Sequence, residues 1–390
     1  MRVIDADGHV EENLETFSDK YFDPALRSIR PRVTGMDGLA YWVIDEQLYP
    51  RRVGPGCHNL GTPTNYDGKV AAHSAGKTDS IGSMELTDLD ARVKAMDEED
   101  IAVQVIYTTL FLAYPLTNNV ALGSALCSSY NRWLGDRLSG HQRLKWSAVV
   151  NLDDIPGSVR EVHEVKKLGA VSVMVLGTAG DHMLDHPRLL PFYEALLEEN
   201  LALGVHVGWS CPAVSNLYSH IYPSGVIAFH IPLLMAFTAL VSGGVMDRFP
   251  DLRVVFLEAG CQWVPFILER MHHRYKNQGS TLRKFLPQTA PIQKLPVMEY
   301  IKRGNIYFST EVEDEILPHV LNLVGETQVI FGSDMPHGHP VGVVVDSHSM
   351  PFLDALRQRF YEVKRHIFNL THASEGASCR PCCQANQRQC

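Results

Sequence analysis

A short stretch near the N-terminus carries residues of the types that bind metal ions or move protons. In VIDADGHVEE, which begins at residue 3, the polar residues Asp5, Asp7 and His9 alternate with small or apolar ones. Alternation with a period of two places these three side chains on one face of a strand. Carboxylates and imidazoles on a buried face cost free energy unless they are paired or bind a metal ion. The stretch therefore predicts a polar site on a buried strand.

Acidic and histidine residues also stand where several later strands are expected to end, and one more histidine opens a predicted helix. Together with the first pair, the candidates are Asp7, His9, His206, His230, Glu258 and Asp334. Carboxylates and imidazoles in one place suit Zn²⁺, Mn²⁺ or Fe²⁺ rather than a thiolate-bound metal. The three negative charges among these candidates suit two divalent ions better than one. Whether the site binds one ion or two stays open at this point.

Apolar runs separated by helical segments predict the fold that positions these residues. The runs are mostly continuous, as in parallel strands that are buried on both faces. The eight predicted strands are residues 3–9, 102–109, 145–152, 170–177, 203–209, 252–260, 305–310 and 328–334. The predicted helices are residues 86–101, 118–138, 157–169, 189–202, 230–246, 263–277 and 316–325.

Eight alternating strand and helix units favour an α/β fold, a distorted (β/α)₈ TIM barrel. In such a barrel, catalytic groups lie at the C-terminal ends of the strands, where most of the candidate residues stand. A doubly wound open sheet is the alternative architecture. Its dinucleotide-binding version is disfavoured because no G-x-G-x-x-G turn follows the first strand.

The barrel is expected to occupy residues 1–350, with a long irregular insertion at 13–84 after the first strand. The insertion is rich in Gly, Pro and Asn, and one hairpin is expected at 39–50. Residues 351–390 are expected to form a C-terminal helix and a tail with four cysteines. The C-x-x-C unit of this tail resembles half of a zinc site. No second half lies at a finger spacing, so we expect reducible thiols there.

Composition and charge limit the classes of partner. A net charge of −9 argues against nucleic acid or an anionic membrane as the main partner. We see no apolar run that approaches the ~20 residues of a membrane span, and no secretory signal. The scattered cysteines Cys57, Cys127, Cys211 and Cys261 are typical of free thiols in a cytosolic protein. We therefore expect a cytoplasmic protein that binds a small-molecule substrate, with no nucleic acid and no membrane as partner.

Four motifs together resemble the amidohydrolase-related superfamily, in the branch that contains aminocarboxymuconate-semialdehyde decarboxylase and γ-resorcylate decarboxylase. They are Asp7-Gly8-His9 on the first strand, His206 on the fifth, RFPDLRVVFLEAG at 248–260 and FGSDMPH at 331–337. The resemblance covers roughly residues 1–350. It implies a distorted TIM barrel and a divalent metal ion whose ligands are Asp7, His9, His206 and Asp334.

The chain departs from the pattern of this branch at two site positions. The first motif begins with Asp7, where members with one metal ion often have a histidine. Glu258 stands where the decarboxylases usually have the histidine that activates water. The fourth predicted strand ends in VMVLG, without the lysine that other amidohydrolase branches carboxylate. Glu258 and His230 are therefore either ligands of a second metal ion or, respectively, a general base and a substrate contact.

The resemblance and the candidate ligands together imply a metal-dependent enzyme. The leading hypothesis is hydrolysis or non-oxidative decarboxylation of a small carboxylated organic substrate, with water activated by the metal ion and Asp334 as a proton shuttle. The second hypothesis is O₂-dependent hydroxylation at a dinuclear Fe or Mn/Fe site on the same fold. The third is an inactive barrel that acts as a partner subunit. We expect a homo-oligomer, or a hetero-oligomer with a related barrel.

Overall fold

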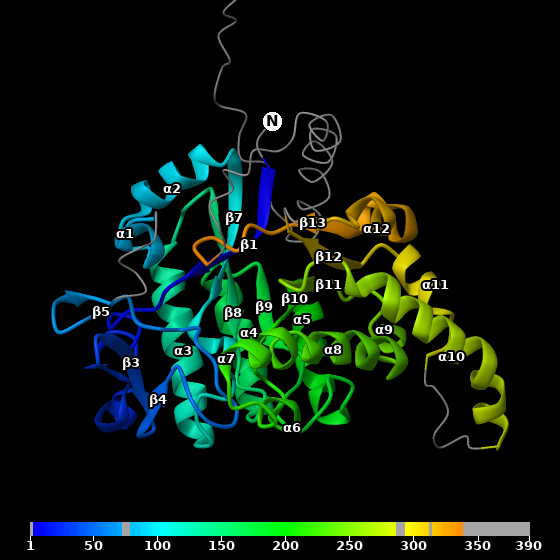
Figure 1. Cartoon of the computed structure of the whole chain (residues 1–390), viewed down its shortest axis with the longest axis horizontal. Coiled ribbons are helices and arrows are strands. Elements are labelled where there is room, and N and C mark those ends of the chain that lie inside the picture. The colour runs from blue at the N-terminus through cyan, green and yellow to red at the C-terminus, as the bar shows by residue number, and fades with distance from the viewer. Residues whose placement is uncertain (1–2, 72–78, 286–292, 312–313, 338–390) are drawn as a thin grey trace, which may run out of the picture.

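The fold is built around eight strands that run parallel to one another (Figure 1). A computed structural model describes residues 3–71, 79–285, 293–311 and 314–337 of the chain. The strands form one sheet in the order β1-β7-β8-β9-β10-β11-β12-β13, and all neighbours pair in parallel. They span Val3–Val10 (β1), Ile101–Thr108 (β7), Leu144–Val149 (β8), Ser172–Leu176 (β9), Ala202–His206 (β10), Val254–Leu257 (β11), Ile306–Thr310 (β12) and Val329–Phe331 (β13).

The first and last strands meet, so the sheet is nearly closed into a barrel. Gly8 of β1 forms a parallel bridge with Met335, just beyond β13. The His9 amide donates a hydrogen bond to the Met335 carbonyl at 2.6 Å, and the Asp334 amide donates to the Asp7 carbonyl at 2.9 Å. The arrangement confirms the predicted (β/α)₈ TIM barrel.

The barrel strands are apolar runs because both of their faces are covered. Every residue of β1, β9, β10 and β12 is buried, as is typical of parallel sheets with helices outside. Aromatic side chains contribute much of this core. The ring of Phe237, from a covering helix, lies 5.4 Å from the ring of Phe256 and 5.8 Å from that of Phe308. The barrel strands also bury polar residues, and the ionisable ones on β1 and β10 are described with the site below.

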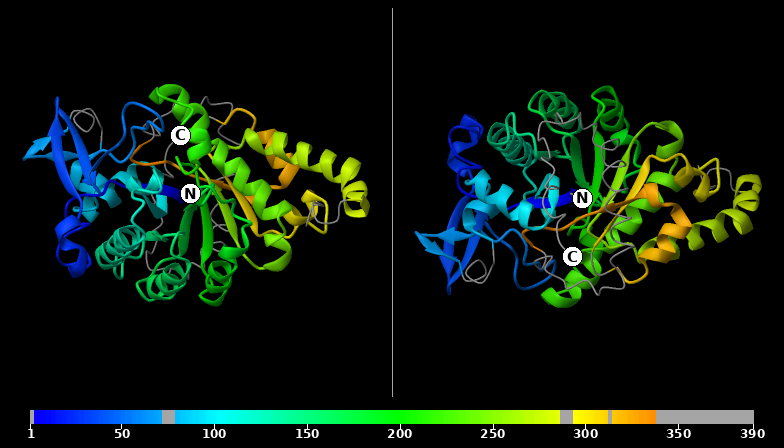
Figure 2. Two further views of the ribbon diagram at one scale, coloured as in Figure 1. Left: turned by 90° about the horizontal axis from the view of Figure 1, so that it is seen from below. Right: turned by 90° about the horizontal axis from the view of Figure 1, so that it is seen from above.

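Helices connect the strands and surround the barrel (Figure 2). Their bounds are Ile81–Met84 (α1), Leu89–Glu98 (α2), Val120–Arg137 (α3), Ile155–Lys167 (α4), Leu190–Glu198 (α5), Pro212–Ser215 (α6), Ile221–Pro223 (α7), Ile231–Ser242 (α8), Val245–Arg248 (α9), Trp263–Phe285 (α10), Val297–Lys302 (α11) and Leu317–Val324 (α12). The prediction of one helix at 230–246 is wrong in extent. Gly244 takes a left-handed conformation with φ of 82° and separates α8 from α9.

The insertion after β1 contains two small antiparallel sheets, which lie to one side of the barrel (Figure 1). Its strands are Arg32–Met36 (β2), Leu39–Ile44 (β3) and Gln47–Tyr49 (β4) in the first sheet, and Asn65–Tyr66 (β5) and Lys69–Val70 (β6) in the second. The β3–β4 pair confirms the hairpin expected at 39–50. Trp42 of β3 is buried, and its ring meets the ring of Phe17 edge-on at 5.4 Å. The insertion is therefore packed rather than wholly irregular.

The helical stretch Ile221–Ser242 corrects one expectation. It is long and apolar enough to cross a membrane, with a mean hydropathy of 1.9, although no such run was expected from the sequence. The stretch comprises α7, a π-helical turn at Ser224–Ala228 and α8. However, 56% of the apolar 18-residue window within it is buried inside the protein, and Phe237 packs against the barrel core. Core helices often pass this test of length and composition, so the stretch is weak evidence for a membrane span.

Several expectations fall on parts of the chain that the structure does not describe. Residues 351–390, with the four cysteines of the tail, lie outside the described residues. The division of the chain near residue 350 therefore stays a prediction. The other four cysteines are buried and free, as expected of unpaired thiols: Cys57, Cys127, Cys211 and Cys261.

Candidate metal centre

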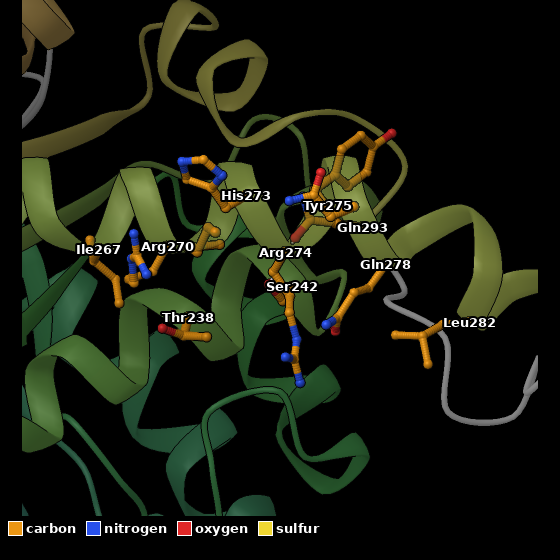
Figure 3. A pocket seen from close by; sticks show the side chains of 12 residues that line it. Thr238, Ser242, Ile267, Arg270, His273, Arg274, Tyr275, Gln278, Leu282 and Gln293 are labelled. Atoms are coloured by element: carbon orange, nitrogen blue, oxygen red, sulfur yellow. Dashed lines mark hydrogen bonds between the residues drawn. The ribbon is translucent and has the colours of Figure 1, made fainter.

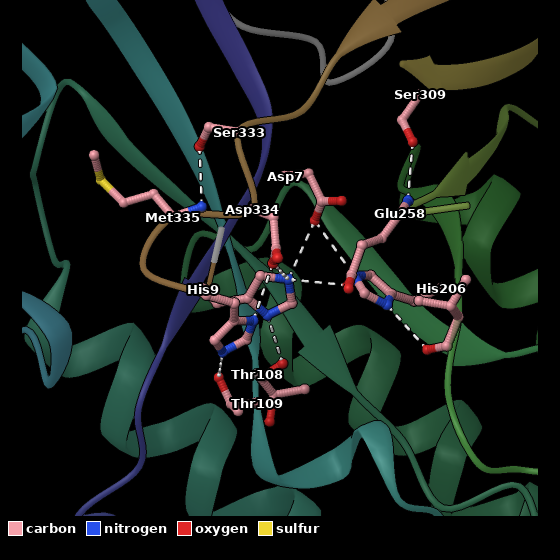
Figure 4. A network of polar contacts seen from close by, with 12 residues as sticks. Asp7, His9, Thr108, Thr109, His206, Glu258, Ser309, Ser333, Asp334 and Met335 are labelled. Carbon is pink, nitrogen blue, oxygen red and sulfur yellow. Dashed lines mark hydrogen bonds and ion pairs between the residues drawn. The ribbon is translucent and has the colours of Figure 1, made fainter. Parts of the chain in front are cut away.

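Four of the predicted site residues converge at the C-terminal ends of the barrel strands (Figure 4). Asp7 and His9 come from β1, His206 is the last residue of β10, and Glu258 directly follows β11. Each offers one ligand atom, and these four atoms all lie within 4.8 Å of one another. The His206 Nε2 atom lies 3.3 Å from Asp7 Oδ1 and 3.4 Å from Glu258 Oε2. Residues separated by up to 251 positions in the chain thus form one cluster.

Asp334 adjoins this cluster from the last strand of the barrel. Its Oδ1 atom lies 3.5 Å from His9 Nε2. With His9 and His337 it makes a second group of potential metal ligands, which shares His9 with the first. Five of the six predicted residues are therefore brought together. We call Asp7, His9, His206, Glu258 and Asp334 the metal centre.

His230 lies in neither group of potential ligands. It precedes the first turn of α8, and its Nδ1 atom lies 3.2 Å from the Val226 carbonyl oxygen. Its ring packs edge-on against that of Phe229 at 5.0 Å. The structure thus gives no support to His230 as a ligand of a second ion, and its role as a substrate contact stays a prediction. His337 was not among the six candidate residues, although it ends the FGSDMPH motif at 331–337.

Backbone carbonyls orient both imidazoles of the centre. The Nδ1 atom of His9 lies 2.9 Å from the Thr108 carbonyl oxygen, and Nδ1 of His206 lies 3.0 Å from the Val207 carbonyl oxygen. A carbonyl oxygen only accepts, so each Nδ1 carries the proton. In its neutral form each ring would therefore turn the lone pair of Nε2 toward a cation bound among the side chains of the centre. This is the arrangement of histidines that bind metal ions, in which the second ring nitrogen donates to a backbone or carboxylate oxygen.

Two buried atoms of the centre indicate whether a cation fits among its side chains. Among the residues that the structure describes, His9 Nε2 and Glu258 Oε2 have no hydrogen-bond partner. They lie 3.8 Å apart. Buried polar atoms are nearly always satisfied, and exceptions point to a missing ion, water or functional role. A divalent cation bound by these donors would satisfy both atoms, so the residues present fit a metal ion.

The carboxylates of the centre oppose one another electrostatically. Burial alone would raise the pKa of Asp7, but the imidazoles of His206 and His9 outweigh it and hold that pKa below its usual value. Burial, together with the charges of Asp334 and Asp7, raises the pKa of Glu258 well above its ordinary value. A bound cation would offset this repulsion and favour the ionised form of Glu258.

The backbone is strained at two of the five residues of the centre. Glu258 has φ of 58° and Asp334 has φ of 54°, values in the left-handed region that non-glycine residues rarely adopt. Neighbouring strands hold these conformations. The Glu258 amide donates to Ser309 Oγ at 2.9 Å, and the Asp334 amide donates to the Asp7 carbonyl at 2.9 Å. Strained residues of this kind cluster at functional sites, where the surrounding structure compensates for them.

Asp5, the third polar residue of the first motif, fastens the seam between β1 and β13 instead of entering the centre. Its Oδ1 atom accepts hydrogen bonds from the Asp7 amide at 3.1 Å and the Ser333 amide at 2.9 Å. Its Oδ2 atom accepts from Ser333 Oγ and Gln104 Nε2, both at 2.6 Å. The buried Arg92 reinforces the seam by donating to the Met335 carbonyl at 3.0 Å. These bonds fix the backbone of β1 next to Asp7 and so help to hold Asp7 in position.

Two hollows in the described part of the molecule differ in their relation to the centre. One of about 110 Å³ lies among the loops that follow β4, β7 and β10, and its walls include Tyr49, Arg51, His58, Tyr114 and Trp209. The other, of about 640 Å³, lies between α8 and α10 (Figure 3). No residue that lines either hollow belongs to the centre. Of these two, the smaller hollow stands among loops on the side of the barrel where the centre lies.

Comparisons with known proteins agree with the fold and with the predicted family. The sequence model of the amidohydrolase family matches residues 88–356. The 2-amino-3-carboxymuconate-6-semialdehyde decarboxylase of Dictyostelium discoideum is 24% identical over 266 residues, which are 66% of this chain and 68% of that protein.

Solved structures share the fold at lower sequence identity. An amidohydrolase from Mycobacterium avium subsp. paratuberculosis K-10 has a TM-score of 0.72 and 21% identity, over 94% of this chain and 97% of that one. A 5-carboxyvanillate decarboxylase from Novosphingobium aromaticivorans has a TM-score of 0.62 and 19% identity, over 75% of this chain and 83% of that one. Its structure contains manganese and 4-hydroxy-3-methoxy-5-nitrobenzoic acid. At these identities the likeness shows the shared barrel.

Proposed function

This chain belongs to the amidohydrolase family and is a metal-dependent enzyme, a decarboxylase or hydrolase, and we propose that it decarboxylates a small aromatic acid without an oxidant. In this proposal Asp7, His9, His206 and Asp334 bind one divalent ion, with Glu258 beside it. The observation that carries the proposal is the pair of buried donor atoms, His9 Nε2 and Glu258 Oε2, that lack hydrogen-bond partners within the described structure.

The donor set favours particular metals. Two imidazole nitrogens and carboxylate oxygens suit Mn²⁺, Zn²⁺ or Fe²⁺. Carboxylate-rich sets suit manganese, and the 5-carboxyvanillate decarboxylase of similar fold contains manganese. We therefore propose Mn²⁺ as the resident ion, with Zn²⁺ as the alternative. Bound at the centre, the ion would act as a Lewis acid on a substrate oxygen.

The side chains of the centre supply the proton that the reaction needs. In decarboxylation the bond between the ring carbon and the carboxylate carbon breaks, and its electron pair stays on the ring carbon. CO₂ leaves, and the ring carbon takes a proton. Glu258 Oε2 lies 3.4 Å from His206 Nε2 within the centre and is not engaged in a hydrogen bond to any described residue. We assign it this proton transfer, because it is the carboxyl group of the centre that the proposed ligand set leaves free to act as a general acid or base.

The smaller hollow supports a flat, anionic substrate. Trp209 follows His206 by three residues, so their Cα atoms lie no more than ~11 Å apart. Its indole is buried beside the ring of His58, with the ring centres 5.2 Å apart. Tyr114 adds a second aromatic wall, and Arg51 adds a positive charge. An aromatic ring with a carboxylate or phenolate group matches both the walls and the charge.

Metal analysis and a product assay test this proposal. We expect the purified protein to bind about one divalent ion per chain and to release CO₂ from carboxylated phenols such as 5-carboxyvanillate, at the same rate with and without O₂. Removal of the ion by a chelator should abolish the release, and Mn²⁺ should restore it. If the substrate is consumed without release of CO₂, the enzyme is a hydrolase. If no metal ion binds, the proposal is wrong.

A second function is favoured by the two overlapping groups of potential ligands. Because Asp7, His9, His206 and Glu258 form one group and His9, Asp334 and His337 form another, two ions could bind in place of one. Such a site suits O₂-dependent hydroxylation by iron or by manganese and iron together. Two such ions per chain, with turnover that requires O₂, would establish this second function and exclude decarboxylation.

A further inference from the structure

Two neighbouring threonines at the end of β7 contact histidines on opposite sides of the barrel seam (Figure 4). The Thr108 carbonyl oxygen lies 2.9 Å from Nδ1 of His9. The Thr109 hydroxyl oxygen lies 2.8 Å from Nε2 of His337. Thr108 and Thr109 are almost wholly buried. One turn of backbone thus orients a member of the metal centre and a histidine outside it.

The proton on His337 Nε2 can be assigned from the partners of Thr109. Thr109 Oγ1 lies 2.9 Å from the Val10 carbonyl oxygen, which can only accept. The single hydroxyl proton of Thr109 therefore lies between these two oxygens. Thr109 Oγ1 must then accept from His337, so Nε2 of His337 is the donor. This bond fixes the rotation of the imidazole about its side-chain axis.

The other side of the His337 ring faces the metal centre. Its Nδ1 atom lies 3.0 Å from Asp334 Oδ1, a carboxylate oxygen that accepts, so Nδ1 donates to it as Nε2 donates to Thr109. The ring also packs against the ring of His9, with the centres 4.4 Å apart and the planes inclined by 35°. Only 8% of the His337 side chain is exposed. His337 therefore contacts two residues of the centre and has little freedom to move away.

A buried carboxylate holds the two threonines in place. Glu12 accepts hydrogen bonds from the Thr109 amide at 3.2 Å and from the Leu110 amide at 2.9 Å. It also accepts from the hydroxyl of Thr108. These bonds tie the end of β7 to the segment that follows β1, so the position of Thr109 Oγ1 relative to Asp334 is defined by the barrel itself.

We propose that His337 is a positioning residue, which holds the Asp334 carboxylate toward the metal ion, and that Thr109 fixes the orientation in which it does so. The inference rests on the proposed function only in requiring a metal ion at the centre. Asp334 needs such support because its backbone has the strained φ of 54°. A carboxylate fixed by a second partner binds a metal ion more tightly than one that rotates freely, and loss of such partners typically weakens binding 10–100-fold.

The test compares two substitutions of His337 and two of Thr109 in the full-length protein. An asparagine at position 337 keeps an N–H donor near the place of Nδ1, whereas a leucine of similar size keeps none. A serine at position 109 keeps the hydroxyl group, whereas a valine keeps only the shape. Affinity for Mn²⁺ alone is measured by competition with a chelator, and kcat and KM are measured at saturating Mn²⁺. His319→Asn, at an exposed position of α12, is the control.

We expect His337→Leu to weaken Mn²⁺ binding about 10–100-fold, and His337→Asn to recover most of that loss. Thr109→Val acts only through His337 and should weaken binding less, by about tenfold, the lower end of this range. Thr109→Ser should recover this loss. At saturating Mn²⁺, kcat should fall more than KM rises, because the carboxylate is misplaced rather than the substrate.

Three results would overturn the proposal. Mn²⁺ affinity in His337→Leu equal to that of the wild type shows that Asp334 needs no support. Complete loss of Mn²⁺ in both His337 variants shows that His337 is itself a ligand. Loss of thermal stability in the Leu and Asn variants alike, with unchanged Mn²⁺ affinity, shows a structural role only. A wild-type protein that binds Mn²⁺ but releases no CO₂ refutes the proposed function, while the affinities still decide the role of His337.

Discussion

The two halves of the barrel mouth use the same kind of strand end for different purposes. β8 and β9 end in the buried apolar residues Val149 and Leu176. β10 ends in His206, and Glu258 and Asp334 follow β11 and β13 within three residues. All these strands are parallel members of one sheet. The fold therefore provides equivalent positions, and the side chains placed there decide whether a position contributes packing or chemistry.

The difference is visible in how each half satisfies its own groups. Around Val149 and Leu176 the contacts are apolar and leave only a small hollow of about 20 Å³, so burial itself stabilises that half. Both halves contain buried polar atoms without a hydrogen-bond partner among the described residues, such as Ser147 Oγ and Ser172 Oγ on β8 and β9. In the polar half, however, His9 Nε2 and Glu258 Oε2 lie within a cluster of potential metal ligands, and two residues there have strained backbones. The protein by itself therefore leaves buried ligand atoms of the polar half without hydrogen-bond partners. A cation would satisfy them.

The largest effect is expected from removing a ligand in the polar half. His206→Ala should eliminate most of the bound metal and lower activity by at least about a thousandfold, which corresponds to ~4 kcal/mol in the barrier. The barrel should still fold, because His206 lies at a strand end rather than among the packed side chains of the core. Metal content, turnover and circular dichroism are measured together. If the variant keeps stoichiometric metal and normal turnover, His206 is not a ligand.

Glu258→Gln should have the next largest effect. It should also distinguish a centre that binds one metal ion from a centre that binds two. With one ion, Glu258 transfers a proton, so the variant keeps its metal and kcat falls by about 10²–10⁴-fold. With two ions, Glu258 is a ligand, and the metal content falls to half because a neutral amide replaces a charged oxygen. An unchanged metal content together with an unchanged rate would show that Glu258 is neither.

The apolar half should respond to substitution in stability alone. Leu176 is 4% exposed at the end of β9, so Leu176→Ala should lower the free energy of unfolding by about 2–4 kcal/mol. Metal stoichiometry and kcat of the folded protein should not change. Leu176→Met is the matched control and should cost less than about 1.5 kcal/mol. A loss of metal in Leu176→Ala without unfolding would contradict the separation of the two halves.

Much of this division could be predicted from sequence, because it depends on local patterns. Apolar runs identified the eight strands of the barrel, but not β2, β5 and β6 of the insertion. The ionisable residues beside those runs identified most of the centre. The bounds of the strands were less certain. The run at 252–260 predicted a longer strand than β11, which ends at Leu257, because Glu258 turns into the left-handed region. No pattern of residue types predicts a left-handed backbone conformation at a particular glutamate.

Which histidines reach the metal centre depends on the path of the chain between strands and helices, and the sequence pattern does not show this path. His337 follows β13 by six residues, whereas His230 stands 24 residues after β10 and directly before α8. His230 precedes the first turn of α8 and contacts its own backbone at Val226. His337 follows the turn at Asp334, which brings its ring back over His9. These spacings alone do not decide which ring reaches the centre, because each case depends on the direction in which a loop leaves the barrel.

The smallest expected effect concerns His58, an imidazole of the mouth that lies outside the metal centre. It is 4% exposed, and its ring lies 5.2 Å from that of Trp209. Burial, with the charge of Arg51 beside it, lowers the pKa of His58 to about 4. The folded protein therefore keeps this ring neutral at pH values where the unfolded chain protonates it. The pKa of His58 should therefore report how far water enters the hollow of about 110 Å³.

The sign of the pH effect follows from the protons bound in each state. Between the unfolded pKa near 6.5 and the folded pKa of about 4, the unfolded chain binds more protons, so stability falls as the pH falls. His58→Gln removes this contribution. The difference in unfolding free energy, wild type minus variant, should therefore be smaller at pH 4.5 than at pH 7.5, by about 1–3 kcal/mol. Urea unfolding at both pH values measures it, with the exposed His319→Gln as control. An equal difference at both pH values would mean that water reaches His58 and that the hollow is too wet to select a flat apolar ring.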